Sequence, residues 1–139
     1  MINRIFSLVE PGRQLHMVCH PSAATTQRTD IVGDEEYLQL AILNFDKGRT
    51  FTPHKHIEKQ VPLTAIAQES WVVIRGKVKA YFYDLDDNLL CTEELNAGDV
   101  SITLYGGHNY EILEDDTLVL EYKTGPYYGQ KLDKVFIDG

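Results

Sequence analysis

Three histidines and one glutamate are the residues of this 139-residue chain whose types and spacing predict chemistry. His54 and His56 stand two residues apart in G-R-T-F-T-P-H-K-H, a stretch that we expect to be extended. Residues i and i+2 of a strand point to the same face, so both imidazoles would project together. Glu69 opens the run E-S-W-V-V-I-R-G, and His108 lies in Y-G-G-H-N. These groups on neighbouring strands predict a site for a divalent first-row transition metal: Fe, Mn, Ni, Co, Cu or Zn.

The segments that must position these residues have the pattern of strands. Apolar side chains recur with a two-residue period or in short β-branched runs over 37–45, 69–75, 77–84, 89–95, 99–104, 110–113 and 117–123. Residues 77–95 are predicted to form a hairpin, and turn signals recur about every 8 to 12 residues, as in an all-β sandwich or barrel. Residues 3–9 are a candidate short helix, and residues 21–34 are expected to be a loop. The sequence therefore predicts an all-β fold.

Composition and charge limit the classes of partner. The length predicts a single domain, and a hydrophobic content of 43% is enough for a core. The net charge of −8 argues against nucleic acid and against an anionic membrane surface. No stretch approaches the roughly 18 apolar residues of a membrane span, and the first residues do not have the pattern of a signal peptide. With Cys19 and Cys91 expected as free thiols, we expect a cytoplasmic protein.

The first stretch resembles the first motif of the cupin superfamily, G-x5-H-x-H-x3/4-E-x6-G. Gly48 precedes His54 by the motif distance, and Glu69 precedes Gly76 by the motif distance. The interval from His56 to Glu69 departs from the motif, because about a dozen residues separate the two. This insert, residues 57–68, would shape the mouth of the site.

A looser resemblance to the second cupin motif, G-x5-P-x-G-x2-H-x3-N, begins at Gly98 and ends at His108. Its turn is one residue short, and its usual Pro and final Asn are absent. Together the motifs imply a double-stranded β-helix, the cupin jelly roll, in one domain over residues 1–139. N-terminal strands would occupy 1–46, the motifs about 48–113, and a last strand and tail 117–139. The implied metal ligands are His54, His56, Glu69 and His108.

The tail, E-Y-K-T-G-P-Y, resembles the small WbuC-type cupins of bacterial surface-polysaccharide gene clusters. That resemblance implies a sugar or nucleotide-sugar as the small-molecule ligand. We expect a metal-dependent isomerase or epimerase, in which a base moves a proton next to a polarised carbonyl. The candidate bases are Glu121, Tyr110 and His16. Glu121 would face the cavity if the leucines of its strand, Leu118 and Leu120, belong to the core.

Several alternatives stay open from the sequence. Glu58 lies closer to the histidine pair than Glu69 and is a rival ligand, and the whole cluster is alternatively a polar barrel mouth without metal. Cupin ketoisomerases without metal use a histidine base, although they usually lack the glutamate found here at Glu69. A non-catalytic binding or sensor module and an Fe(II) oxygenase are further alternatives. A homodimer is expected, because exposed edge strands of such folds often pair.

Overall fold

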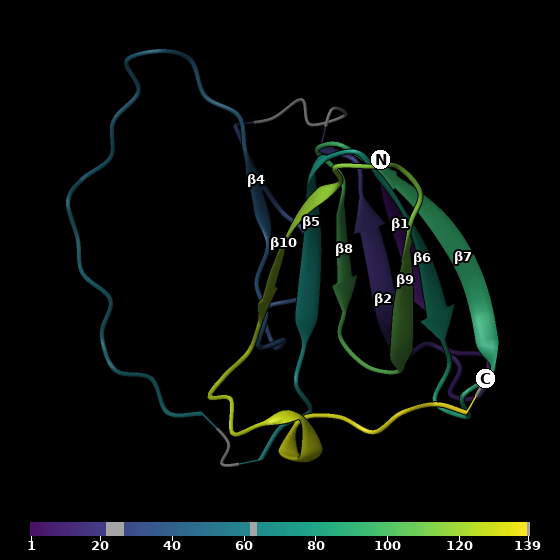
Figure 1. Cartoon of the computed structure of the whole chain (residues 1–139). Helices are drawn as coiled ribbons and strands as arrows, with labels where there is room; N and C mark the ends of the chain where they lie inside the picture. The colour runs from purple at the N-terminus through teal and green to yellow at the C-terminus, as the bar shows by residue number, and fades with distance from the viewer. Residues whose placement is uncertain (22–26, 62–63, 139) are drawn as a thin grey trace.

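The computed structural model describes residues 1–21, 27–61 and 64–138 of the chain, and strands dominate it (Figure 1). The strands are β1 Ile2–Phe6, β2 Gln14–Cys19, β3 Arg28–Asp30, β4 Ala41–Leu43, β5 Glu69–Arg75, β6 Lys77–Tyr83, β7 Leu89–Asn96, β8 Val100–Thr103, β9 Gly107–Ile112 and β10 Leu118–Lys123, and a 3-10 turn, η2, covers Gln130–Leu132. Within the described ranges no helix has the length and apolar character needed to cross a membrane.

The strands form two main antiparallel layers. The larger sheet has the order β1-β2-β8-β5-β10, the smaller sheet has the order β7-β6-β9, and β3 and β4 form a two-stranded sheet. Figure 1 shows the two larger sheets facing each other. Between them lies an inner core that includes Val18, Val73 and Phe82, all with 0% exposed surface. The chain is therefore a small all-β domain with antiparallel sheets, as the sequence predicted.

Strand β6 shows how the sequence pattern produces this layering. Val78, Ala80 and Phe82 are fully buried against the opposite sheet, while the residues between them are partly exposed. β6 pairs with β7 from Lys77 to Tyr83, which confirms the predicted hairpin. A second core cluster covers the outer face of the larger sheet, where Ile31 and Val32 pack against β2 and β8.

The segment predicted as a short helix, residues 3–9, was interpreted wrongly. β1 covers Ile2–Phe6 and pairs with β2. Ile2 packs against the outer cluster and Ile5 against the inner one. Apolar residues three apart in the sequence favour a helix, but Ile2 and Ile5 lie on opposite faces of one strand.

Two other expectations need correction. The expected loop over 21–34 contains the short strand β3, and its residues 22–26 lie outside the described ranges. The strand expected over 37–45 is limited to Ala41–Leu43. In the residues that precede β4, hydrogen bonds with side chains take the place of strand pairing. The Leu38 amide donates to Gln68 Oε1 at 2.8 Å, and Gln39 Nε2 donates to the Gly33 and Glu36 carbonyls.

Residues 44–61, which we call the arm, leave the body of the domain beyond β4 (Figure 1). No part of the arm pairs as a strand. Its backbone hydrogen bonds among the described residues are Asn44 N–H to the Gln27 carbonyl at 3.1 Å and Arg49 N–H to the Asp46 carbonyl at 3.3 Å. The expected strand at His54 therefore has no pairing partner here.

The C-terminal tail crosses the lower end of both sheets in Figure 1, from β10 toward the far side of the domain. Lys123 Nζ binds Asp133 Oδ2 at 3.2 Å, which fastens the tail next to β10. Ile137 then packs against Gly107 at the start of β9, where an added Cβ would overlap its side chain. The tail thus bridges the two sheets beside the start of β5.

Candidate functional site

Glu69 and His108, two of the four predicted metal ligands, lie together between the sheets. Glu69 is the first residue of β5, and His108 is the second residue of β9. His108 Nε2 lies 3.3 Å from Glu69 Oε1, and their side chains are 24% and 14% exposed. The pair is therefore largely shielded and still reachable from solvent.

A chain of hydrogen bonds fixes the orientation of His108. His108 Nδ1 lies 2.9 Å from Thr103 Oγ1, and that oxygen also lies 3.0 Å from His16 Nδ1. His16 Nε2 lies 3.0 Å from the Tyr83 carbonyl oxygen. Because a carbonyl only accepts, the His16 proton is on Nε2, and the Thr103 hydroxyl donates to His16 Nδ1. Thr103 Oγ1 must then accept a hydrogen bond from the N–H group at His108 Nδ1.

The direction of these hydrogen bonds determines how His108 can interact with Glu69. A neutral His108 with its proton on Nδ1 presents the lone pair of Nε2 to the carboxylate. Burial acts to raise the pKa of Glu69, but the hydrogen bond and charge of His108, with the charges of Lys123 and Lys134, outweigh it and leave the pKa lowered. Glu69 is therefore ionised, and the contact needs a positive charge on His108 or between the two groups.

Aromatic side chains form one wall beside this pair. Trp71 donates its indole N–H to Glu69 Oε1 at 3.2 Å, and its ring stacks on Tyr110 with centroids 3.9 Å apart. The Tyr110 hydroxyl lies 2.9 Å from Ser101 Oγ. Burial raises the pKa of Tyr110, so its phenol stays protonated at neutral pH. Tyr110, a candidate base, is placed here as a hydrogen-bonding hydroxyl.

The candidate base Glu121 lies opposite Trp71 in the register of β10 with β5, and Lys123 lies opposite Glu69. Val119, on the same face of β10, packs against the inner core. Leu118 and Leu120 are 42% and 48% exposed and do not belong to the core. The sequence had predicted that Glu121 would face the cavity only if these two leucines were core residues. Glu121 nevertheless shares the inner face of β10 with Val119.

His16, the third candidate base, is fully buried. Burial lowers its pKa to about 4 despite the opposing hydrogen bond to Tyr83. Both ring nitrogens are already bonded, to Thr103 and to the Tyr83 carbonyl. In this arrangement His16 positions Thr103 and, through it, His108.

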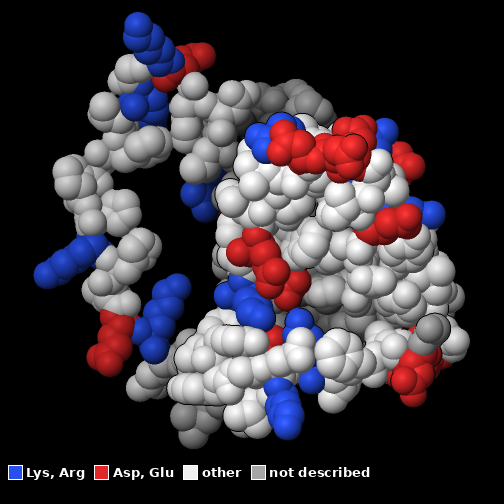
Figure 2. Space-filling model, viewed as in Figure 1, with Lys and Arg blue, Asp and Glu red and all other residues white. Residues whose placement is uncertain are grey.

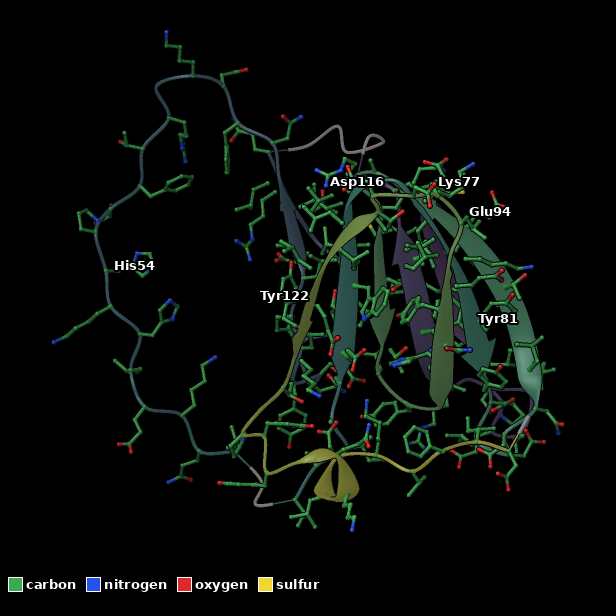
Figure 3. All side chains as sticks on the ribbon, in the orientation of Figure 1. His54, Lys77, Tyr81, Glu94, Asp116 and Tyr122 are labelled. Carbon is green, nitrogen blue, oxygen red and sulfur yellow. The ribbon has the colours of Figure 1, made fainter. Side chains whose placement is uncertain are left out.

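His54 lies on the arm, away from the body of the domain (Figure 3), and His56 follows it two residues later on the same arm. Their rings contact each other with centroids 5.5 Å apart, and His54 Nδ1 lies 3.0 Å from the Thr52 carbonyl. Glu58 is exposed on the same arm. Nowhere in the described residues do three or more metal-binding side chains come together. The structure thus joins one half of the predicted ligand set and leaves the other half on the arm.

Thr103, Ser101 and Asp133 are site residues that the sequence did not single out. A strict two-residue alternation over β8 would have placed Ser101 and Thr103 on the inner face beside one another. Asp133 lies in an irregular tail with no periodic pattern, so no local signal marked it.

Comparisons of the chain with protein-family models, with curated proteins and with solved structures gave no match. Membership of the cupin superfamily therefore stays a prediction that rests on the motif residues.

Proposed function

We propose that this chain is a metal-binding jelly-roll protein of the cupin type that acts on a small sugar-like molecule. The observation that supports it is the position of His108 Nε2, which faces the Glu69 carboxylate at 3.3 Å while Nδ1 is bound to Thr103 Oγ1. The contact needs positive charge, either a proton on His108 Nε2 or a metal cation that both groups bind. Adjacent ligands of a metal at about 2.1 Å from each donor lie about 3 Å apart, so this pair fits two positions around such an ion.

The second layer of hydrogen bonds supports the same assignment. Histidines that bind a metal commonly use the other ring nitrogen as a donor, which fixes the tautomer. Here Thr103 Oγ1 accepts from His108 Nδ1 at 2.9 Å and is itself oriented by His16. His108 is thus held with its metal-binding nitrogen toward Glu69.

His54 and His56 would complete the ligand set if the arm docks along the free edge of β9. Within the described residues, β9 pairs only with β6, so its other edge is open to a strand. His108 lies on this edge strand, and directly opposite residues on paired strands have Cβ atoms about 5 Å apart. The two-residue spacing of His54 and His56 would put both imidazoles on the face of His108.

The charges of the two segments favour this docking. The arm carries four basic and two acidic residues, and Figure 2 shows its Lys and Arg side chains projecting along it. β9 and the turn that follows it carry four acidic residues, Glu111, Glu114, Asp115 and Asp116. Burying the exposed apolar residues of the arm, such as Phe51 and Ile57, would also stabilise the docked state.

Bound at Glu69 and His108, a metal would supply a Lewis acid that polarises a carbonyl or hydroxyl oxygen. Glu121, an exposed residue opposite Trp71 in the register, would be the base that moves the proton. In an isomerisation, it would take the proton from the carbon that bears the hydroxyl and return it to the neighbouring carbonyl carbon, while the hydroxyl proton passes to the former carbonyl oxygen. Trp71 offers its stacked ring system beside this position, and no redox partner is needed for the reaction.

A binding module without turnover is the second candidate. It is favoured by the state of the two other base candidates, since both His16 nitrogens are bonded and Tyr110 has a raised pKa. Of the three candidate bases, Glu121 is then the one left to transfer a proton. Incubation in deuterated water with aldose and ketose sugars separates the two candidates, because an isomerase incorporates deuterium next to the carbonyl and a binding module does not.

Equilibrium dialysis against first-row divalent ions tests the metal. We expect about one ion per chain, and affinity reduced at least tenfold in His108→Ala. His20→Ala is the matched control, because His20 pairs with Asp99 at 2.8 Å and touches none of the site residues. Absence of binding by the wild type, or equal loss in both variants, would reject the metal proposal.

A further inference from the structure

A hollow lies on the outer face of the larger sheet, on the side away from Glu69. It has a volume of about 410 Å³, within the range of small-molecule sites. Its walls come from the turn after β1, the start of β2, the 33–36 turn and the end of β8. Those that matter for recognition are Phe6, Arg13, Gln14, Glu35, Glu36 and Tyr105.

One wall offers hydrogen-bond donors. Gln14 Oε1 accepts from Arg4 Nη1 at 3.1 Å, but Gln14 Nε2 is buried and has no hydrogen-bond partner among the described residues. A buried amide of this kind is incomplete until it meets an acceptor. Beside it, the Arg13 guanidinium lies over the Tyr105 ring, 4.5 Å from the centroid. Its Nη1 binds Glu10 at 2.6 Å, which holds the cation in place and leaves further N–H groups of the fork.

Two glutamates in the lining, Glu35 and Glu36, offer acceptors. Glu36 Oε2 is oriented by Gln68 Nε2 at 2.6 Å and by the Tyr105 hydroxyl at 3.1 Å. Glu35 folds over Gly33, where an added Cβ would lie 3.1 Å from its Oε1. No ion pair joins Arg13 to either glutamate in the described chain. The hollow is thus lined by both a guanidinium and carboxylates: Arg13 lies over the Tyr105 ring, and the Tyr105 hydroxyl binds Glu36.

Apolar surface completes the lining. Phe6 is 45% exposed although it ends a strand, and Leu104 is buried at the base of the hollow. A ligand that matches this arrangement carries an anion toward Arg13 and Gln14, a cation toward Glu35 and Glu36, and a short apolar group against Phe6.

We propose that this hollow binds a small zwitterion, an α-amino acid with an aliphatic side chain. Its carboxylate would accept from Gln14 Nε2 and Arg13, and its ammonium would donate to Glu35 and Glu36. Charge-assisted hydrogen bonds at both ends give selectivity against molecules that lack either charge. The site is separate from the proposed metal site and does not depend on it.

Calorimetric titration with three matched compounds tests the proposal. L-leucine is expected to bind, whereas N-acetyl-L-leucine, which lacks the cation, and L-leucinamide, which lacks the anion, should each bind about tenfold or more weakly. No heat with L-leucine at about 1 mM, or equal affinity for all three compounds, would overturn it.

Variants and NMR locate the binding. Glu35→Gln should weaken L-leucine binding about tenfold, while Glu114→Gln, an exposed glutamate outside the hollow, should leave it unchanged. Amide shifts on titration should gather at residues 12–14 and 33–36. Shifts that gather around Glu69 instead, or equal effects of the two variants, would contradict the assignment. Binding that survives His108→Ala would separate this site from the metal proposal.

Discussion

The proton positions at the candidate site follow from one acceptor, the Tyr83 carbonyl. It forces the proton of His16 onto Nε2, which makes Thr103 a donor to His16 and an acceptor from His108. A buried histidine that contacts the same threonine thereby decides that Nδ1 of His108 carries a proton. His16 acts here as a positioning residue, although its type alone made it a candidate base.

The stability of the domain should depend on pH through His16. Its pKa is lowered from 6.5 to about 4 in the folded state, chiefly by burial. Below pH 6.5 the unfolded chain therefore binds a proton that the folded chain does not. Stability from this group is complete above pH 6.5 and is lost as pH falls toward 4, by about 2 kcal/mol between pH 7 and pH 5.

Urea unfolding of wild type and His16→Gln at pH 7 and pH 5 measures this contribution. Glutamine keeps hydrogen-bonding groups and does not titrate, so the loss of stability on acidification should be about 2 kcal/mol smaller in the variant. An identical pH dependence in both proteins would show that His16 is not buried in its neutral form.

Of the four residues that the motifs marked as ligands, two lie together, and His54 and His56 lie apart from them. Glu69 and His108 were selected together and do meet. Thr103 was missed, although its position on an alternating strand would have indicated its side. The pairing of Lys123 with Asp133 had no signal, because it depends on where an irregular tail returns.

At the level of elements, two-residue alternation predicted the strands whose two faces differ. β6 was predicted from Val78, Ala80 and Phe82, which are all buried. The pattern gave a wrong prediction for β1, because Ile2 packs against the outer core cluster and Ile5 against the inner one. It was also wrong for residues 37–40, where the side chains of Gln39 and Gln68 form hydrogen bonds with the backbone in place of strand pairing. In both cases tertiary contacts, which local patterns do not contain, decide the structure.

The turn between β5 and β6 supplies a test at this scale. Gly76 has a φ of +85°, and a Cβ added there would lie 2.9 Å from Thr117 Cα. Gly48 has a similar φ of +93° but nothing within 4 Å. Gly76→Ala should therefore destabilise the domain by about 2 kcal/mol more than Gly48→Ala, because only the first adds a clash with backbone to the strained φ.

Chemical denaturation of the two alanine variants beside the wild type checks this difference. The comparison cancels the cost of the left-handed conformation, which both positions share. Equal destabilisation by the two substitutions would mean that Thr117 does not pack closely against the turn.

At the scale of the whole molecule, the arm and the body are complementary. The chain has a net charge of −8, yet the arm has more basic than acidic residues and exposes apolar side chains. The open edges of β9 and β10 offer strand partners in the body. The types and spacing of His54 and His56 were readable from the sequence, but the position of the arm was not, since it depends on contacts between distant segments.

The central proposal is that the arm histidines and the Glu69–His108 pair bind one metal ion. X-ray absorption at the metal edge of the loaded protein counts imidazole ligands directly. The wild type should show three, and the double variant His54→Ala, His56→Ala should show one, with affinity weaker by at least about tenfold. Two or fewer imidazoles in the wild type, or the same spectrum and affinity in the variant, would contradict the proposal.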